Sequence, residues 1–106
     1  MRIKSELLWG ESIRDKSKVY DLLQTKKLPF GYYLLLYTKE GRLEFIPAVM
    51  QSNRYHMSRD CVVFGIAHDK KEAQGMICNI LTEIYANHTY DSVYDYVREV
   101  LGEPVC

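Results

Sequence analysis

The first regular pattern along the chain is a set of apolar side chains at helical spacing between Ser12 and Lys27. Ser12, with Asp15 three residues later, resembles a capping box, in which two side chains satisfy free N–H groups at a helix start. Pro29 lacks an N–H donor and cannot continue the helix. We therefore predict a helix over this segment. Residues 7–9, which are apolar, precede it either as a short strand or as a lead-in to the helix.

The segment from residue 30 to residue 67 carries strand-like patterns. Tyr32–Tyr37 is apolar in both alternating sets, which is typical of a central strand. Residues 39–41 then predict a hairpin turn, because they end in a glycine that adopts positive φ without strain. The strand after the turn reaches Pro47. A proline donates no ladder hydrogen bond, so it favours an edge position or the end of the strand.

A third strand is predicted over Cys61–Ala67. Regular alternation would place its bulky side chains on one face and its small ones on the other. The bulky set is Val62, Phe64 and Ile66, and the small set is Cys61, Gly65 and Ala67. A face of small side chains allows another backbone to approach closely.

Two more helices are predicted after the third strand. Asp69 and Glu72 have capping-box spacing, and apolar side chains then continue at helical spacing as far as Ile84. The last helix is predicted from Asp91 to Leu101, before a glycine and a proline that would end it.

The order of these elements predicts the fold class. The chain has no internal repeat and no linker, so we predict one domain over residues 1–106. The expected fold is α+β: a two-layer structure with a three-stranded antiparallel meander and the helices packed on one face, in the order α-β-β-β-α-α.

Composition and charge exclude several classes of protein. Hydrophobic residues make up 47% and charged residues 26% of the chain, which is typical of a globular protein. Fourteen basic and fourteen acidic side chains cancel, so no overall field favours nucleic acid or an anionic membrane. The start of the chain lacks a signal-peptide pattern, and the longest apolar run, residues 32–37, is too short to cross a bilayer. A cytoplasmic location is therefore expected.

The three cysteines give no pattern typical of a metal or redox site. Cys61, Cys78 and Cys106 cannot all pair with one another, and they lack CxxC spacing. A zinc site could be assembled from Cys61, Cys78, His56 and His88. Cysteines in reducing compartments, however, commonly serve only in packing. We expect no metal and no other cofactor.

The segments on either side of the strands resemble one known family. KVYDLLQTKKLPF, followed by two strands and then by DKKEAQGM, has the order of a double-stranded-RNA-binding domain. The resemblance covers roughly residues 17–86. Members of that family use lysines at the start of their second helix to contact phosphates across the major groove. The resemblance implies that Lys70 and Lys71 contact RNA.

The polar segment QSNRYHMSRD, residues 51–60, is a candidate binding loop. It combines flexible hydrogen-bond donors with an aromatic ring, which suits recognition of an anion or of another protein. The residues concerned are Arg54, Tyr55, His56 and Arg59. The alternative is that the loop is polar only because it faces water.

Catalysis has no positive support in the sequence. His68 and Asp69 are adjacent at the end of a strand, but the Asp69 carboxylate is expected to cap a helix. No glycine-rich phosphate loop precedes that helix. An active site assembled from distant residues would leave no such motif, so an enzyme stays an alternative. We assign no catalytic residue.

The aromatic content indicates an interface. Nine tyrosines and one tryptophan are a high aromatic load for 106 residues. Three helices do not readily cover both faces of a three-stranded sheet, so we expect some tyrosine rings on a half-exposed face, as at many interfaces. The predicted function is therefore a small binding or regulatory module that contacts another protein or a second copy of itself.

Overall fold

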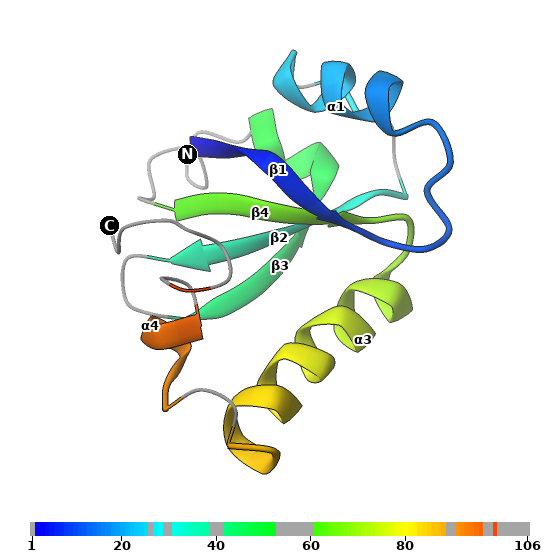
Figure 1. The fold of residues 1–106 in the computed structure, drawn as a ribbon. Helices are drawn as coiled ribbons and strands as arrows, with labels where there is room; N and C mark the ends of the chain where they lie inside the picture. Colours follow the sequence, from blue (N-terminus) through cyan, green and yellow to red (C-terminus); the bar gives the residue numbers. More distant parts are fainter. Residues whose placement is uncertain are drawn as a thin grey trace.

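The strands and helices follow the apolar patterns of the chain, and the chain is an α+β protein as predicted (Figure 1). The computed structural model describes residues 2–25, 27–28, 31–38, 42–52, 61–88, 91–96 and 99. The strands are β1 (Arg2–Trp9), β2 (Tyr33–Thr38), β3 (Leu43–Pro47) and β4 (Cys61–Ala67). The helices are α1 (Lys16–Gln24), α3 (Lys70–Leu81) and α4 (Val93–Tyr96), with a 3-10 turn η1 (Ala48–Ser52) and a π-helical turn η2 (Thr82–Ala86).

The four strands form one mixed sheet in the order β1-β4-β2-β3. β2 pairs antiparallel with β3 and β4, whereas β1 pairs parallel with β4. The predicted three-stranded antiparallel meander is therefore wrong in strand number and direction, because residues 2–9 supply a fourth, parallel strand. The predicted order α-β-β-β-α-α is also wrong, since the described chain begins with β1. β2 is central as predicted, and Pro47 ends the edge strand β3.

Helices cover both faces of the sheet, and not one face as predicted (Figure 1). The core on the α1 side includes Leu7, Ile13, Val19, Leu23, Leu34, Leu36, Val63 and Ile66. The core on the α3 side includes Leu35, Tyr37, Phe64, Ala67, Ala73, Ile77, Ile80 and Ile84. Both alternating sets of β2 are apolar because each set packs against a helix on its own side of the sheet.

β4 departs from regular alternation at Phe64. Residues 63 and 65 pair with consecutive residues of β2, so Phe64 is an extra residue that forms a bulge. After the bulge the two faces of the strand exchange. Phe64 lies in the core on the α3 side and Ile66 lies in the core on the α1 side. The predicted common face for Val62, Phe64 and Ile66 is therefore wrong.

The start of α1 differs from the prediction, whereas the start of α3 confirms it. α1 begins at Lys16 and not at Ser12, because Asp15 is the cap and its Oδ1 accepts a hydrogen bond from the Lys18 N–H at 3.1 Å. In α3 the predicted cap Asp69 accepts from the N–H three residues later at 2.7 Å. The chain continues from α3 into η2, as the apolar stripe indicated.

The end of the chain is described only in part. α4 comprises four residues, and most of the predicted continuation to Leu101 lies outside the described residues, as does the predicted turn at 39–41. Over the ranges that are described, no helix has the length and the apolar character needed to cross a membrane.

A pair of glycine substitutions tests how closely β4 is enclosed by its neighbours. A Cβ at Gly65 would lie 3.1 Å from the Leu8 carbonyl oxygen and 3.3 Å from the Leu35 Cβ. We expect Gly65→Ala to lower the free energy of unfolding by about 1–2 kcal/mol, because a backbone atom cannot withdraw easily. The control, Gly75→Ala in α3, has no atom within 4 Å of its Cβ. It should raise the free energy of unfolding by about 0.5–1 kcal/mol through helix propensity. Chemical denaturation measures both, and effects of the same sign would contradict the argument.

Candidate binding site at the start of helices α1 and α3

Glu72 fastens the loop between β1 and α1 to the start of α3. Its carboxylate accepts three hydrogen bonds: from the Ser12 N–H to Oε2 at 3.1 Å, from the Ser12 hydroxyl to Oε1 at 2.9 Å, and from the His68 N–H to Oε1 at 2.9 Å. The contact with Ser12 spans 60 positions in the sequence. Ser12 therefore helps to position the start of α3, and it does not cap α1 as the sequence suggested.

These hydrogen bonds alter the protonation of Glu72. Burial raises the pKa of the Glu72 carboxyl, but the bonds from the His68 N–H and from the Ser12 hydroxyl and N–H lower it by more in total. Its pKa therefore lies below the ordinary value for a glutamate. A carboxylate with a lowered pKa is a weak base, so its contact with the Ser12 hydroxyl fits a structural role and not the activation of a nucleophile.

Gly10 leaves the space that the Glu72 carboxylate occupies. The Gly10 N–H donates to the Ile66 carbonyl at 2.9 Å, and the Gly10 carbonyl accepts from the Ile13 N–H at 3.1 Å. These bonds fix the loop against the end of β4. A Cβ at position 10 would fall on the Glu72 carboxylate, so any larger side chain would displace it.

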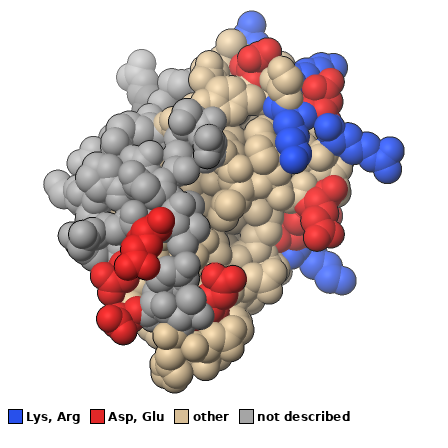
Figure 2. Space-filling view, in the orientation of Figure 1, with Lys and Arg blue, Asp and Glu red and all other residues tan. Residues whose placement is uncertain are grey.

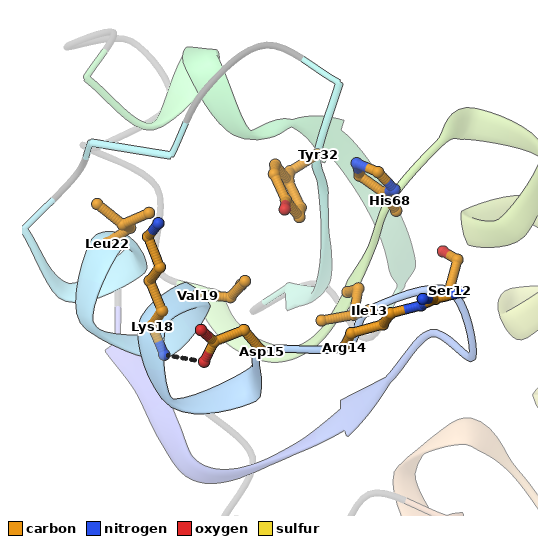
Figure 3. A pocket seen from close by; sticks show the side chains of 9 residues that line it. All are labelled: Ser12, Ile13, Arg14, Asp15, Lys18, Val19, Leu22, Tyr32 and His68. Atoms are coloured by element: carbon orange, nitrogen blue, oxygen red, sulfur yellow. Dashed lines mark hydrogen bonds between the residues drawn. The ribbon is translucent and has the colours of Figure 1, made fainter.

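A pocket of about 350 Å³, here called the α1 pocket, opens beside the first turns of α1 (Figure 3). Its walls come from residues 12–15, from Lys18, Val19 and Leu22 on α1, and from Tyr32 and His68. The rings of Tyr32 and His68 lie together, with centroids 4.7 Å apart and planes inclined by 39°. Figure 3 shows this ring pair across the pocket from the α1 residues. The pocket thus joins a basic rim, an apolar wall and an aromatic wall.

The α1 pocket was not predicted from the sequence. His68 was noted only as a neighbour of Asp69, and Tyr32 only as a strand residue. The pocket forms because the β1–α1 loop lies against the ends of β2 and β4. These segments are far apart in the sequence, so no local residue pattern predicts their contact.

A second pocket of about 370 Å³ lies against the same loop. It is lined by Trp9, Gly10, Glu11, Glu72, Gly75, Met76 and Asn79. The charged residues among its described lining are Glu11 and Glu72, and Glu72 already accepts three hydrogen bonds. The polar groups of this pocket are therefore less free to receive a ligand than those of the α1 pocket.

The predicted RNA-contacting residues lie in the first turn of α3. Lys70 and Lys71 are exposed, and they line neither of these two pockets. The acidic side chains of Asp69 and Glu72 flank them in sequence. The structure brings Lys70 and Lys71 to the surface, and RNA contact stays a prediction.

The predicted binding loop falls outside the described part of the chain. Arg54, Tyr55, His56 and Arg59 all belong to residues 53–60, which the structure does not describe. Their role as a binding loop stays a prediction.

The cysteine and histidine candidates do not form a described metal site. Within the residues that the structure describes, no group of three or more His, Cys, Asp or Glu side chains could hold a metal ion. Cys78 is free and exposed on α3. The position of His56, the side chain of Cys61 and the terminal Cys106 lie outside the description.

The tyrosines of the sheet differ in exposure, and their expected role at an interface stays a prediction. On β2, Tyr37 is buried, and Tyr33 is half-buried with its ring centroid 6.1 Å from that of Phe45. Among the tyrosines whose side chains the structure describes, Tyr85 is the most exposed, with 59% of its area open to water.

Comparison of the chain with protein-family models, with curated proteins and with solved structures finds no match.

Replacing Glu72 tests its role in joining the loop to α3. The pKa of Glu72 is lower in the folded chain than in the unfolded chain, so its stabilising contribution is complete well above pH 4.5 and is lost as the pH falls through the lowered pKa. We expect Glu72→Gln to lower the free energy of unfolding by about 1 kcal/mol at pH 7, a value that allows for solvent screening. The difference from the wild type should shrink towards pH 3.

The matched control is Glu83→Gln, an exposed glutamate in η2. It should change the free energy of unfolding by less than about 0.5 kcal/mol. Urea denaturation across a pH series measures both variants. A Glu72→Gln effect that does not change with pH would contradict the proposed role of the carboxylate charge.

Proposed function

We propose that the protein is a small binding module that contacts a basic segment of another protein through the end of the molecule that contains η2 and α4. The observation that carries this proposal is the exposure of Tyr85 within an acidic part of the chain. A large aromatic ring that is 59% exposed is typical of a contact residue.

The charges of the chain are divided unevenly along the sequence. Residues 1–71 hold 13 basic and 8 acidic side chains, whereas residues 72–106 hold 1 basic and 6 acidic side chains. Figure 2 shows acidic groups without neighbouring basic groups at the lower left, where α4 lies, and a mixture of basic and acidic groups at the right, over α1 and the start of α3. A negative field at one end attracts a positively charged partner and accelerates its association.

Tyr85 lies on a turn, η2, that a buried neighbouring residue holds against the core. Ile84, its neighbour in η2, is buried in the core on the α3 side, while Tyr85 itself points outward. π-helical turns are frequent at functional sites. The face of a tyrosine ring attracts arginine and lysine. Together with the exposed carboxylates of Glu83 and Asp91, this ring fits a partner segment that contains such residues.

A second copy of the chain is a partner of the same chemistry. The basic first part of one copy could meet the acidic end of another in a head-to-tail contact. Light scattering of the protein alone separates self-association from binding of a different protein. A head-to-tail contact would raise the measured molar mass without any added peptide, and added salt would lower it again.

RNA binding through Lys70 and Lys71 is the second candidate, because both lysines are exposed at the start of α3. Their surroundings favour it less. Residues 10–25 and 68–72, which meet at this corner, together hold five basic and five acidic side chains. Binding of duplex RNA requires the neutralisation of several phosphates, and an electrically balanced surface does not supply it.

A defined peptide tests the protein-binding proposal. We expect a fluorescent peptide of alternating arginine and leucine to bind at low salt, and a glutamate–leucine peptide of equal length not to bind. Tyr85→Ser should lower the affinity for the arginine peptide by about threefold to tenfold, because the aromatic contact with the cation is lost. The matched control is Val49→Ser, which alters the other exposed large apolar side chain of the described surface. Fluorescence anisotropy measures binding; an unchanged affinity in Tyr85→Ser would contradict the site.

An electrophoretic mobility assay tests the RNA alternative. If Lys70 and Lys71 contact phosphates, a short RNA duplex should shift at micromolar protein and low salt. Replacing both lysines by alanine should then weaken binding by about tenfold, with a shallower salt dependence. The absence of any shift with the unmodified protein would remove this alternative.

A further inference from the structure

We propose that the α1 pocket binds a small planar aromatic molecule that carries one anionic group, a carboxylate or a phosphate. This site is separate from the Tyr85 surface, so neither proposal depends on the other.

The apolar wall of the pocket suits one face of a flat ring. Ile13 and Val19 are 6% and 5% exposed, and Leu22 is half-buried one turn further along α1. These side chains are held by the core on the α1 side, so the wall does not need to rearrange when a ligand enters. Ile13 and Val19 have little surface left in water, so an aromatic ring placed against this wall would remove apolar surface mainly from Leu22 and from the ring itself.

The opposite wall is aromatic. Tyr32 and His68 lie at the ends of β2 and β4, and their tilted pair leaves ring surface facing the pocket (Figure 3). Aromatic rings prefer offset or edge-to-face contacts with another ring, and the inclination of 39° permits such a contact. An aromatic ligand between this pair and α1 would therefore contact ring surface on one side and aliphatic surface on the other.

The rim of the pocket favours a negative charge. Arg14 and Lys18 are exposed cations at the rim, and among the described lining residues Asp15 is the acidic one. The Oδ1 of Asp15 already accepts the Lys18 N–H as the cap of α1, so part of its hydrogen-bonding capacity is used within the protein. Figure 3 shows Lys18 and Arg14 on either side of Asp15, so each can bind the oxygens of a carboxylate or phosphate through charge-assisted hydrogen bonds at its own part of the rim.

Glu72 holds the two sides of the pocket at a fixed separation. Ser12 belongs to the loop side and His68 to the aromatic side, and both donate to the same Glu72 carboxylate. A site whose walls are fixed before binding loses less entropy when the ligand arrives. The pocket volume, about 350 Å³, lies near the lower end of the range for small-molecule sites, so the ligand is of metabolite size.

The test uses matched charged and neutral probes. Benzoate represents the carboxylates and adenosine monophosphate the phosphates, while benzamide and adenosine are the neutral counterparts. Amide NMR spectra of the full chain are recorded during titration to millimolar concentrations. We expect shifts at Ser12, Val19, Tyr32 and His68 with at least one anionic probe, and binding of its neutral counterpart at least about fivefold weaker. The arm that binds more tightly identifies the anionic group.

Two lysines of the same helical turn provide the variants. Lys18→Glu should lower the affinity for the anionic probe by about tenfold, because it replaces an attractive charge at the rim by a repulsive one. It places a glutamate three residues after the cap Asp15, which a helix start favours, so the variant is expected to fold. Lys16→Glu makes the same charge change outside the pocket lining and should leave the affinity within about twofold. His68→Ala should weaken binding by about threefold or more, through loss of its ring.

Several results would overturn the proposal. One is the absence of shifts with all four probes, and another is a set of shifts that maps away from the α1 pocket. Equal affinities for a charged probe and its neutral counterpart would remove the anionic group from the proposal. Equal losses in Lys18→Glu and Lys16→Glu would show that only the general field of the protein is involved.

Discussion

The hydrogen bonds of the Glu72 carboxylate connect the loop before α1, on one face of the sheet, with α3 on the other face. α1 and α3 lie on opposite faces of the sheet and share no core. The loop that precedes α1 meets α3 at its first turn, where Glu72 accepts from Ser12 and from the backbone of His68. This corner also requires a glycine at position 10, because a side chain there would displace the carboxylate. One charged side chain thus holds the loop against the first turn of α3, beside the α1 pocket.

The sequence predicted elements more accurately than it predicted their arrangement. β2, the Pro47 end of β3, β4 and the Asp69 cap were all evident, because each depends on residues close together in the chain. The apolar character of both sides of β2 correctly indicated a central strand, but it did not indicate that a helix covers each face of the sheet. The bulge at Phe64 could not be predicted, since it depends on the register with the neighbouring strand. The parallel pairing of β1 with β4 depends on residues about 60 positions apart and leaves no local pattern.

The candidate site follows the same division. The cap function of Asp69 is local and was predicted, whereas the hydrogen bonds between Glu72 and Ser12 join distant segments of the chain and were not predicted. The two proposed binding regions lie in different parts of the molecule and differ in character. One is an outward aromatic ring in an acidic part of the sequence, suited to an extended partner. The other is a small, partly enclosed pocket with a basic rim, suited to a small molecule. A module that has both could respond to a small molecule while bound to its partner, since neither region covers the other.

The position of β4 constrains the order in which the sheet is assembled. β4 lies between β1 and β2, so the first strand of the chain has no neighbour until residues 61–67 are in place. During synthesis the β2–β3 hairpin is able to form as soon as it emerges, while β1 and the loop that follows it wait for more than half of the chain. Long-range pairings of this kind close late and slow the folding of a small protein. Until they close, one side of the hairpin offers unpaired backbone groups to any other chain nearby, so this protein is most exposed to aggregation while it is being made.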